Sequence, residues 1–143
     1  MENSEDTKEP TQVIALGIKD HSLMHLALCA NWGLDSAVTI MIGGQVVAGV
    51  LVSGQEYAEH TAKEFRDANS SEEVGNALAN FYDELANDYR KEDGHEMPLN
   101  FIHIKDPAYL RGDGNWYTIR NSYLRVAIDK VAAFSNGKPD TDN

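Results

Sequence analysis

The sequence predicts an α+β domain in which an N-terminal helix packs on a small, strongly bent antiparallel sheet, with two further helices inserted between its strands. Three observations predict this class: a tight apolar hairpin around residue 43, helical periodicity on both sides of it, and strand patterns near the C-terminus. A chain of 143 residues with 42% hydrophobic content suits one globular domain. We expect a disordered acidic segment at residues 1–12, the domain at 13–137 and a disordered tail at 138–143.

The hairpin is the clearest local signal. Residues 38–42 and 46–52 are two apolar runs rich in Val and Ile, and Gly43 and Gly44 join them. A two-residue Gly-Gly connection supplies the positive φ angles that a tight turn demands. Gly49 lies in the middle of the second run, where a glycine indicates a bulge, a sharp bend or another backbone close by.

Helical patterns flank the hairpin. Asp20 or Ser22 can cap a helix that runs to about Asn31, and a second helix is expected over residues 54–68. Ser70 and Glu73 have the spacing of a capping box for a third helix. We expect this third helix to bury an apolar stripe made of Val74, Ala77, Leu78, Phe81, Leu85 and Tyr89.

The C-terminal third returns to strand patterns. A strand is expected over residues 99–105, with Asp106 and Pro107 ending its regular pairing because proline cannot donate to a ladder. Residues 123–134 then read as two strands with a turn near Asp129. The predicted order of elements is the layout of small barrels of the Sm-like type, with closure of the barrel left open. Residues 13–18 fit either an extra strand or the entry to the first helix.

Composition limits the classes of partner. The net charge of −11 disfavours nucleic acid as a partner, because phosphates are held by clustered Lys and Arg. The single cysteine, Cys29, cannot form an intramolecular disulfide and suits a reducing cytoplasm. No apolar run approaches the length of about 20 residues that a membrane-spanning helix needs. The acidity is equally compatible with a saline cell and with a functional role.

A search for chemical motifs predicts a protein that is not an enzyme and that holds no cofactor or metal. His21 and His25 have the i, i+4 spacing of a metal pair, but no HExxH frame accompanies them. Asp83 and Glu84 belong to a charged helix face of the kind that solvent covers. The chain contains no GxSxG, P-loop or GxGxxG motif.

A compact scaffold without catalytic groups acts through its surfaces. The candidate partner or self-association surface is an outward row of His103, Lys105 and Arg125, together with Val131. Exposed strand edges can pair with a second copy, so we expect a homo-oligomer with a dimer as the minimum. The same charges can equally serve to blunt an edge against aggregation.

An Sm-like layout raises RNA binding as an alternative function. True Sm proteins carry an Asp-x-x-Asn after the second strand and an Arg-Gly near the last strand turn. Here Gly54 and Gln55 follow the second strand, and Arg111 with Gly112 precedes the terminal hairpin. Two alternative functions remain. One is an RNA-binding module, and the other is a domain that binds a small molecule or a metal.

Three segments in order resemble the gas vesicle accessory proteins of the U type. They are the hairpin followed by Ser53-Gly54-Gln55-Glu56-Tyr57, the strand Phe101-Ile102-His103-Ile104-Lys105, and the ending Tyr123-Leu124-Arg125-Val126 with Val131-Ala132-Ala133-Phe134 and Gly137. The likeness runs from about Asp20 to Gly137. Leu124 and Val126 depart from the family pattern, which has an aromatic residue before the arginine and a glycine after it.

The resemblance implies a cytoplasmic, non-enzymatic protein that can associate with gas vesicles. Such a protein would assist the assembly, organisation or clustering of these hollow shells through protein–protein contacts. Its partners would be the vesicle shell or other accessory proteins, besides copies of itself. The resemblance supplies no catalytic residue.

Overall fold

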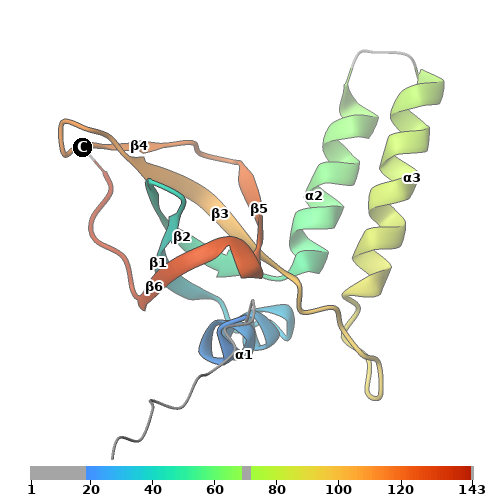
Figure 1. The fold of residues 1–143 in the computed structure, drawn as a ribbon. Coiled ribbons are helices and arrows are strands. Elements are labelled where there is room, and N and C mark those ends of the chain that lie inside the picture. Colours follow the sequence, from blue (N-terminus) through green and yellow to red (C-terminus); the bar gives the residue numbers. More distant parts are fainter. Residues whose placement is uncertain (1–18, 69–71, 143) are drawn as a thin grey trace, which may run out of the picture.

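The computed structural model describes residues 19–68 and 72–142 (Figure 1). Its elements, in chain order, are α1 (His21–Asn31), β1 (Ser36–Ile42), β2 (Gln45–Val52), α2 (Gly54–Asp67), α3 (Glu72–Asp88), β3 (Phe101–Leu110), β4 (Trp116–Thr118), β5 (Tyr123–Ala127), the 3-10 turn η1 (Ile128–Lys130) and β6 (Val131–Asn136). The predicted α+β class, with its N-terminal helix and two-helix insertion, is confirmed. The expectations for residues 1–18 and for Ser70 lie outside the described residues.

The six strands form one antiparallel sheet. Its order is β4-β3-β2-β1-β6, and β5 also pairs with β3. The outer edge of β3 is divided between its two partners, because β5 pairs along Phe101–Lys105 and β4 along Ala108–Leu110. η1 then carries the chain from β5 to β6 at the opposite end of the sheet. Among the described residues no ladder joins β5 to β6, so the sheet is not closed into a barrel.

The β1–β2 hairpin has the predicted two-residue loop. Ile42 pairs with Gln45, which leaves Gly43 and Gly44 as the connection. Gly43 has a φ of 58°, whereas Gly44 does not take a positive φ. A positive φ at the first central residue alone is the pattern of a type II′ turn, whose twist suits a hairpin. Of the two glycines expected to supply the positive φ angles of the turn, Gly43 does so and Gly44 does not.

A bulge interrupts the pairing of β2 with β3. Val50 pairs with Lys105 and Ala48 with Ala108, so Asp106 and Pro107 together oppose the single residue Gly49. Asp106 has a φ of 51°, and its backbone N–H donates to the carbonyl of Ser122 at 2.9 Å. The strand thus continues to Leu110, and the expected stop at Asp106 is wrong because proline sits where the bulge requires no ladder donor.

The core lies between α1 and one face of the sheet. Leu23, Ala27 and Ala30 of α1 are buried there, as their helical spacing predicts. Their neighbours from the sheet and from η1 are Val38, Ile40, Val47, Leu51, Ile102, Ile104, Val126 and Ile128. The helix begins at the cap Asp20, whose side chain accepts a hydrogen bond from the Leu23 N–H.

The helices α2 and α3 form an antiparallel hairpin that stands away from the sheet (Figure 1). The first residues of α2 lie against the sheet, and α3 packs chiefly on α2. The buried residues of the two helices are small, and they include Ala58 and Ala62 on α2 and Gly75, Ala79 and Ala86 on α3. A Cβ atom added to Gly75 would lie 2.9 Å from the carbonyl oxygen of Phe65. The helices therefore approach too closely for a larger residue at that position.

This close approach goes with a buried face of α3 that differs from the predicted one. Val74, Leu78 and Phe81 were expected to be buried, but their exposed fractions are 56%, 39% and 61%. The expectation is wrong because the small residues form the face that meets α2, about a quarter turn of the helix away from the larger ones. Of the predicted stripe, Tyr89 is fully buried and Leu85 is half-buried.

Candidate functional site

A ring cluster anchors the helical hairpin to the sheet. The His103 ring of β3 stacks on the Tyr57 ring of α2, with the ring centres 4.8 Å apart and the planes at 29°. The Tyr89 ring, just beyond α3, meets His103 edge-on at 5.4 Å. A buried histidine of the sheet thus contacts both ends of the inserted hairpin.

The register of β3 with β5 places Arg125 opposite His103. Nη1 of Arg125 lies 2.8 Å from Nε2 of His103, and a guanidinium has only donors, so Nε2 accepts this hydrogen bond. Burial, and next the charge of Arg125, lower the pKa of His103 from 6.5 to about 3. The imidazole is therefore neutral at physiological pH.

Arg125 also contacts aromatic residues around it. Its guanidinium carbon lies 3.8 Å from the centre of the Phe101 ring, which is a close cation–π contact. Nη1 also lies 3.3 Å from the hydroxyl oxygen of Tyr89. The arginine is thus held by rings from β3 and from the segment after α3, and the positive charge stays half-buried.

A charged group borders the cluster at the start of α2. The Tyr123 hydroxyl donates to Oε2 of Glu56 at 2.6 Å, and Nζ of Lys105 lies 3.6 Å from the same oxygen. Burial, followed by the hydrogen bond to Glu56, raises the pKa of the Tyr123 hydroxyl. Burial and the nearby Glu56 charge also raise the pKa of Asp35. These contacts join α2 to β3 and β5 by a second, polar connection.

The structure separates the members of the predicted surface. His103, Lys105 and Arg125 share one sheet face, as their alternation predicts. His103 is only 1% exposed, however, so the expectation of an outward histidine is wrong: α2 and the segment after α3 cover that part of β3. Lys105 is exposed and Arg125 half-buried. Val131 is half-buried, pairs with Ile42 and packs against the core.

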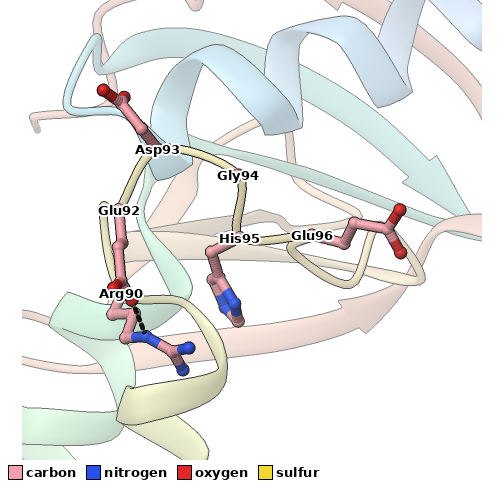
Figure 2. Close-up of a pocket in the computed structure, with 6 residues that line it drawn as sticks. All are labelled: Arg90, Glu92, Asp93, Gly94, His95 and Glu96. Atoms are coloured by element: carbon pink, nitrogen blue, oxygen red, sulfur yellow. Dashed lines mark hydrogen bonds and ion pairs between the residues drawn. The ribbon is translucent and has the colours of Figure 1, made fainter.

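One depression on the described part of the chain is polar and open. It has a volume of about 430 Å³ and is lined by Arg90, Glu92, Asp93, Gly94, His95 and Glu96 (Figure 2). His95 donates from Nε2 to the carbonyl of Asp88 at 2.7 Å, and Arg90 pairs with Glu92. Asp93 and Glu96 point away from each other in Figure 2. The charged groups do not converge on a common point.

His21 and His25 have the spacing of a metal pair, although the sequence predicts no metal site there. Within residues 19–68 and 72–142, no group of three or more His, Cys, Asp or Glu side chains could hold a metal ion. His21 and His25 instead border an open depression with Met24, Leu28 and Leu99.

The second candidate feature is the exposed apolar stripe of α3, which we call the α3 seam. It consists of Val74, Leu78, Phe81 and Leu85. The edge of the Phe81 ring contacts Tyr82 with the ring centres 5.2 Å apart, and Tyr82 in turn stacks on Phe65 of α2 at 5.6 Å. The exposed ring of Phe81 is therefore held in place by packed neighbours. Sequence periodicity identified these residues but assigned them to the core.

The fold and these surfaces define a class: a small α+β domain with an open antiparallel sheet, an anchored helical hairpin and an exposed apolar seam on that hairpin. The sequence model of the family described as "Gas vesicle protein GvpU-like" matches residues 20–139, and the chain belongs to this family. Comparisons with curated proteins and with solved structures gave no match. No helix in the described ranges is both long and apolar enough to cross a membrane.

Proposed function

We propose that this protein is a non-enzymatic accessory protein that assists the assembly, organisation or clustering of gas vesicles through protein–protein contacts. Family membership supports the connection with gas vesicles. The observation that carries the contact function is the α3 seam, where large apolar side chains are exposed on a hairpin that stands away from the sheet (Figure 1). The partners are the vesicle shell or other accessory proteins.

The seam has the physical properties of an interaction site. Contiguous exposed apolar side chains on a small protein mark contact surfaces, whereas scattered ones need no explanation. Aromatic side chains on a rigid support contribute most to such contacts, because little conformational entropy is lost when they bind. Phe81, backed by Tyr82 and Phe65, meets this requirement.

Self-association is a second part of the proposal. In the described sheet β6 pairs with β1 along one edge only, which leaves the other edge with backbone donors and acceptors open to a second copy. A shallow apolar depression lies beside this edge. It is lined by Thr39, Met41, Val46, Ala133, Phe134 and Ser135. We expect a homo-oligomer, with a dimer as its minimum.

A gene-replacement experiment tests the contact function. In a gas-vesicle-producing host, the gene is replaced by the Phe81→Glu variant, and the number, shape and clustering of vesicles are imaged. We expect a defect approaching that of the gene deletion, because a carboxylate on the seam opposes apolar contact. The matched control is Asn76→Glu, which adds the same charge on an exposed position of α3 outside the seam. Vesicles unchanged by both the deletion and Phe81→Glu would contradict the proposal.

A further inference from the structure

We propose that the α3 seam binds an amphipathic helix of another protein whose apolar stripe is flanked by Lys and Arg residues. This inference rests on the proposed contact function and goes beyond it by stating the chemistry of the partner. Three observations carry it: the spacing of the seam, the position of the seam relative to α2, and the charge of α3.

The spacing of the seam matches a helix better than any other partner shape. Its residues follow one another at intervals of four, three and four, in the order Val74, Leu78, Phe81 and Leu85. This is the d-a-d-a order of a heptad repeat, which keeps a stripe facing a neighbouring helix. At 1.5 Å per residue the stripe extends roughly 17 Å along α3. A second helix lying along the seam would pack its apolar side chains between those of the seam over about three helical turns.

The place of the seam on the hairpin leaves room for that helix. α3 already packs on α2 through Gly75, Ala79 and Ala86. At 100° per residue the seam lies about a quarter turn from this face. A helix on the seam would therefore lie beside α3 without displacing α2, and it would complete a three-helix arrangement. No described element of the chain packs extensively on α3 other than α2.

The charge of α3 selects a cationic partner. Residues 72–88 contain five acidic residues, namely Glu72, Glu73, Asp83, Glu84 and Asp88, and no Lys or Arg. Asp83 is neutralised by an ion pair with Arg66 of α2. The other four have no ion pair with any described residue of the chain. Lys and Arg beside the apolar stripe of a partner helix would supply the missing countercharges to Glu84 and Asp88, whereas Glu72 and Glu73 lie in the first turn, where the helix dipole favours carboxylates.

Two of the acidic residues, Glu84 and Asp88, lie next to the seam, where a partner helix would contact them. Glu84 directly precedes Leu85 and occupies a position that flanks the heptad seam. Asp88 follows Phe81 by one heptad, so it continues the stripe at its C-terminal end. A carboxylate in the last turn of a helix is disfavoured by the helix dipole. A cation placed there by the partner would relieve that repulsion.

The same charges disfavour the two other occupants that the chain itself could provide. Two α3 helices packed seam to seam would offer no Lys or Arg to Glu84 and Asp88, because residues 72–88 contain neither residue type. The N-terminal residues 1–12 carry Glu2, Glu5, Asp6 and Glu9 against a single basic residue, Lys8. Neither a second copy nor this segment offers the cationic flanks that α3 requires.

Binding to two designed peptides tests the inference. The first is a four-heptad helical peptide with Leu at positions a and d and Lys at e and g; the second has Glu in place of every Lys. We expect the full-length protein to bind the Lys peptide at least about tenfold more tightly than the Glu peptide in fluorescence anisotropy. Phe81→Glu and Leu78→Glu should each weaken this binding by at least about tenfold, whereas Asn76→Glu should not.

Reversal of the charges on α3 is the most discriminating test of the inference. Glu84→Lys combined with Asp88→Lys should abolish or invert the preference between the two peptides, while the circular dichroism of the variant stays that of the wild-type protein. Binding of the Lys peptide that survives Phe81→Glu and Leu78→Glu would reflect only attraction to a protein of net charge −11, and it would overturn the inference. If the wild-type protein binds neither peptide and the Phe81→Glu variant no longer forms a dimer, the seam contacts a second copy of the chain. That result would also overturn the inference.

The outcomes separate this inference from the proposed function. A vesicle defect in the Phe81→Glu strain, together with equal binding of the two peptides, would reject only the cationic helix. Normal vesicles in that strain would reject the contact function of the seam, whatever the peptides do.

Discussion

Arg125 and His103 face each other across β5 and β3, and Nη1 of the arginine donates to Nε2 of the histidine at 2.8 Å. His103 also stacks on Tyr57 and meets Tyr89 edge-on, so the pair joins the sheet to both ends of the helical hairpin. The orientation of α2 and α3, and with it the direction of the α3 seam, depends on a buried imidazole that must stay neutral.

The pKa of His103 makes stability depend on pH. Because the folded-state pKa is about 3 and the ordinary value is 6.5, the unfolded chain binds more protons between these values. The contribution of His103 to the free energy of unfolding is thus fully present above pH 6.5 and is lost as the pH drops toward 3. At pH 5 the loss is roughly 2 kcal/mol, at about 1.4 kcal/mol per pH unit. Chemical denaturation at pH 7 and pH 5 measures it.

His103→Gln is the matched variant for this measurement. It removes the titrating ring, so the difference in unfolding free energy between pH 7 and pH 5 should shrink by most of that amount. An equal pH dependence in the variant and the wild-type protein would show that other groups cause it.

Gly49 should not accept a side chain. A Cβ atom there would lie 2.3 Å from Cγ2 of Ile104 and 3.0 Å from the carbonyl oxygen of Lys105, both across the bulge. Gly49→Val should lower the free energy of unfolding by roughly 1–3 kcal/mol, the usual cost of overpacking. Thermal unfolding measures the change. Gly44→Ala is the control, because nothing lies within 4 Å of a Cβ atom at that site.

Substitutions on the two faces of α3 should change the free energy of unfolding by very different amounts. Phe81→Ser changes an exposed seam residue and should alter the free energy of unfolding by only about 0.5 kcal/mol. Gly75→Leu should cost at least about 1–3 kcal/mol, because its side chain has to push apart α2 and α3 at the Phe65 carbonyl. Urea denaturation followed by circular dichroism gives both values. A larger loss in Phe81→Ser than in Gly75→Leu would mean that the seam is the buried face after all.

The mass in solution tests the proposed homo-oligomer. Gel filtration with light scattering should give at least twice the 15.8 kDa of one chain at micromolar concentration. A mass of one chain across that range would rule out self-association.

Val131 is expected to act within one subunit. Since it packs against the core and pairs with Ile42, Val131→Asp should lower the melting temperature. Ala132→Asp, at an exposed neighbouring position of β6, should leave it nearly unchanged. If Val131→Asp splits an oligomer without loss of melting temperature, its side chain lies in the interface between copies.

Local signals determined most of the secondary structure. Asp20 and Ser53 cap helices where their side chains accept N–H groups three residues later. Gly43 makes the hairpin turn, and Gly33, with a φ of 103°, ends α1. Such signals act within a few residues of the chain, so a pattern of residue types can reveal them, although the Ser53 cap was not predicted.

Tertiary structure alone decided which faces are buried. Alternation along β3 cannot show that α2 and Tyr89 cover His103, because those groups come from distant parts of the sequence. Periodicity along α3 shows two faces, one of small and one of large apolar residues, and favours the large one for the core. In the structure the face of small residues is buried, because the close contact between α2 and α3 requires Gly75 at the interface. Val74, Leu78 and Phe81 are left exposed because the small residues of α3 face α2, and the close approach of the two helices at Gly75 is not encoded by any local pattern.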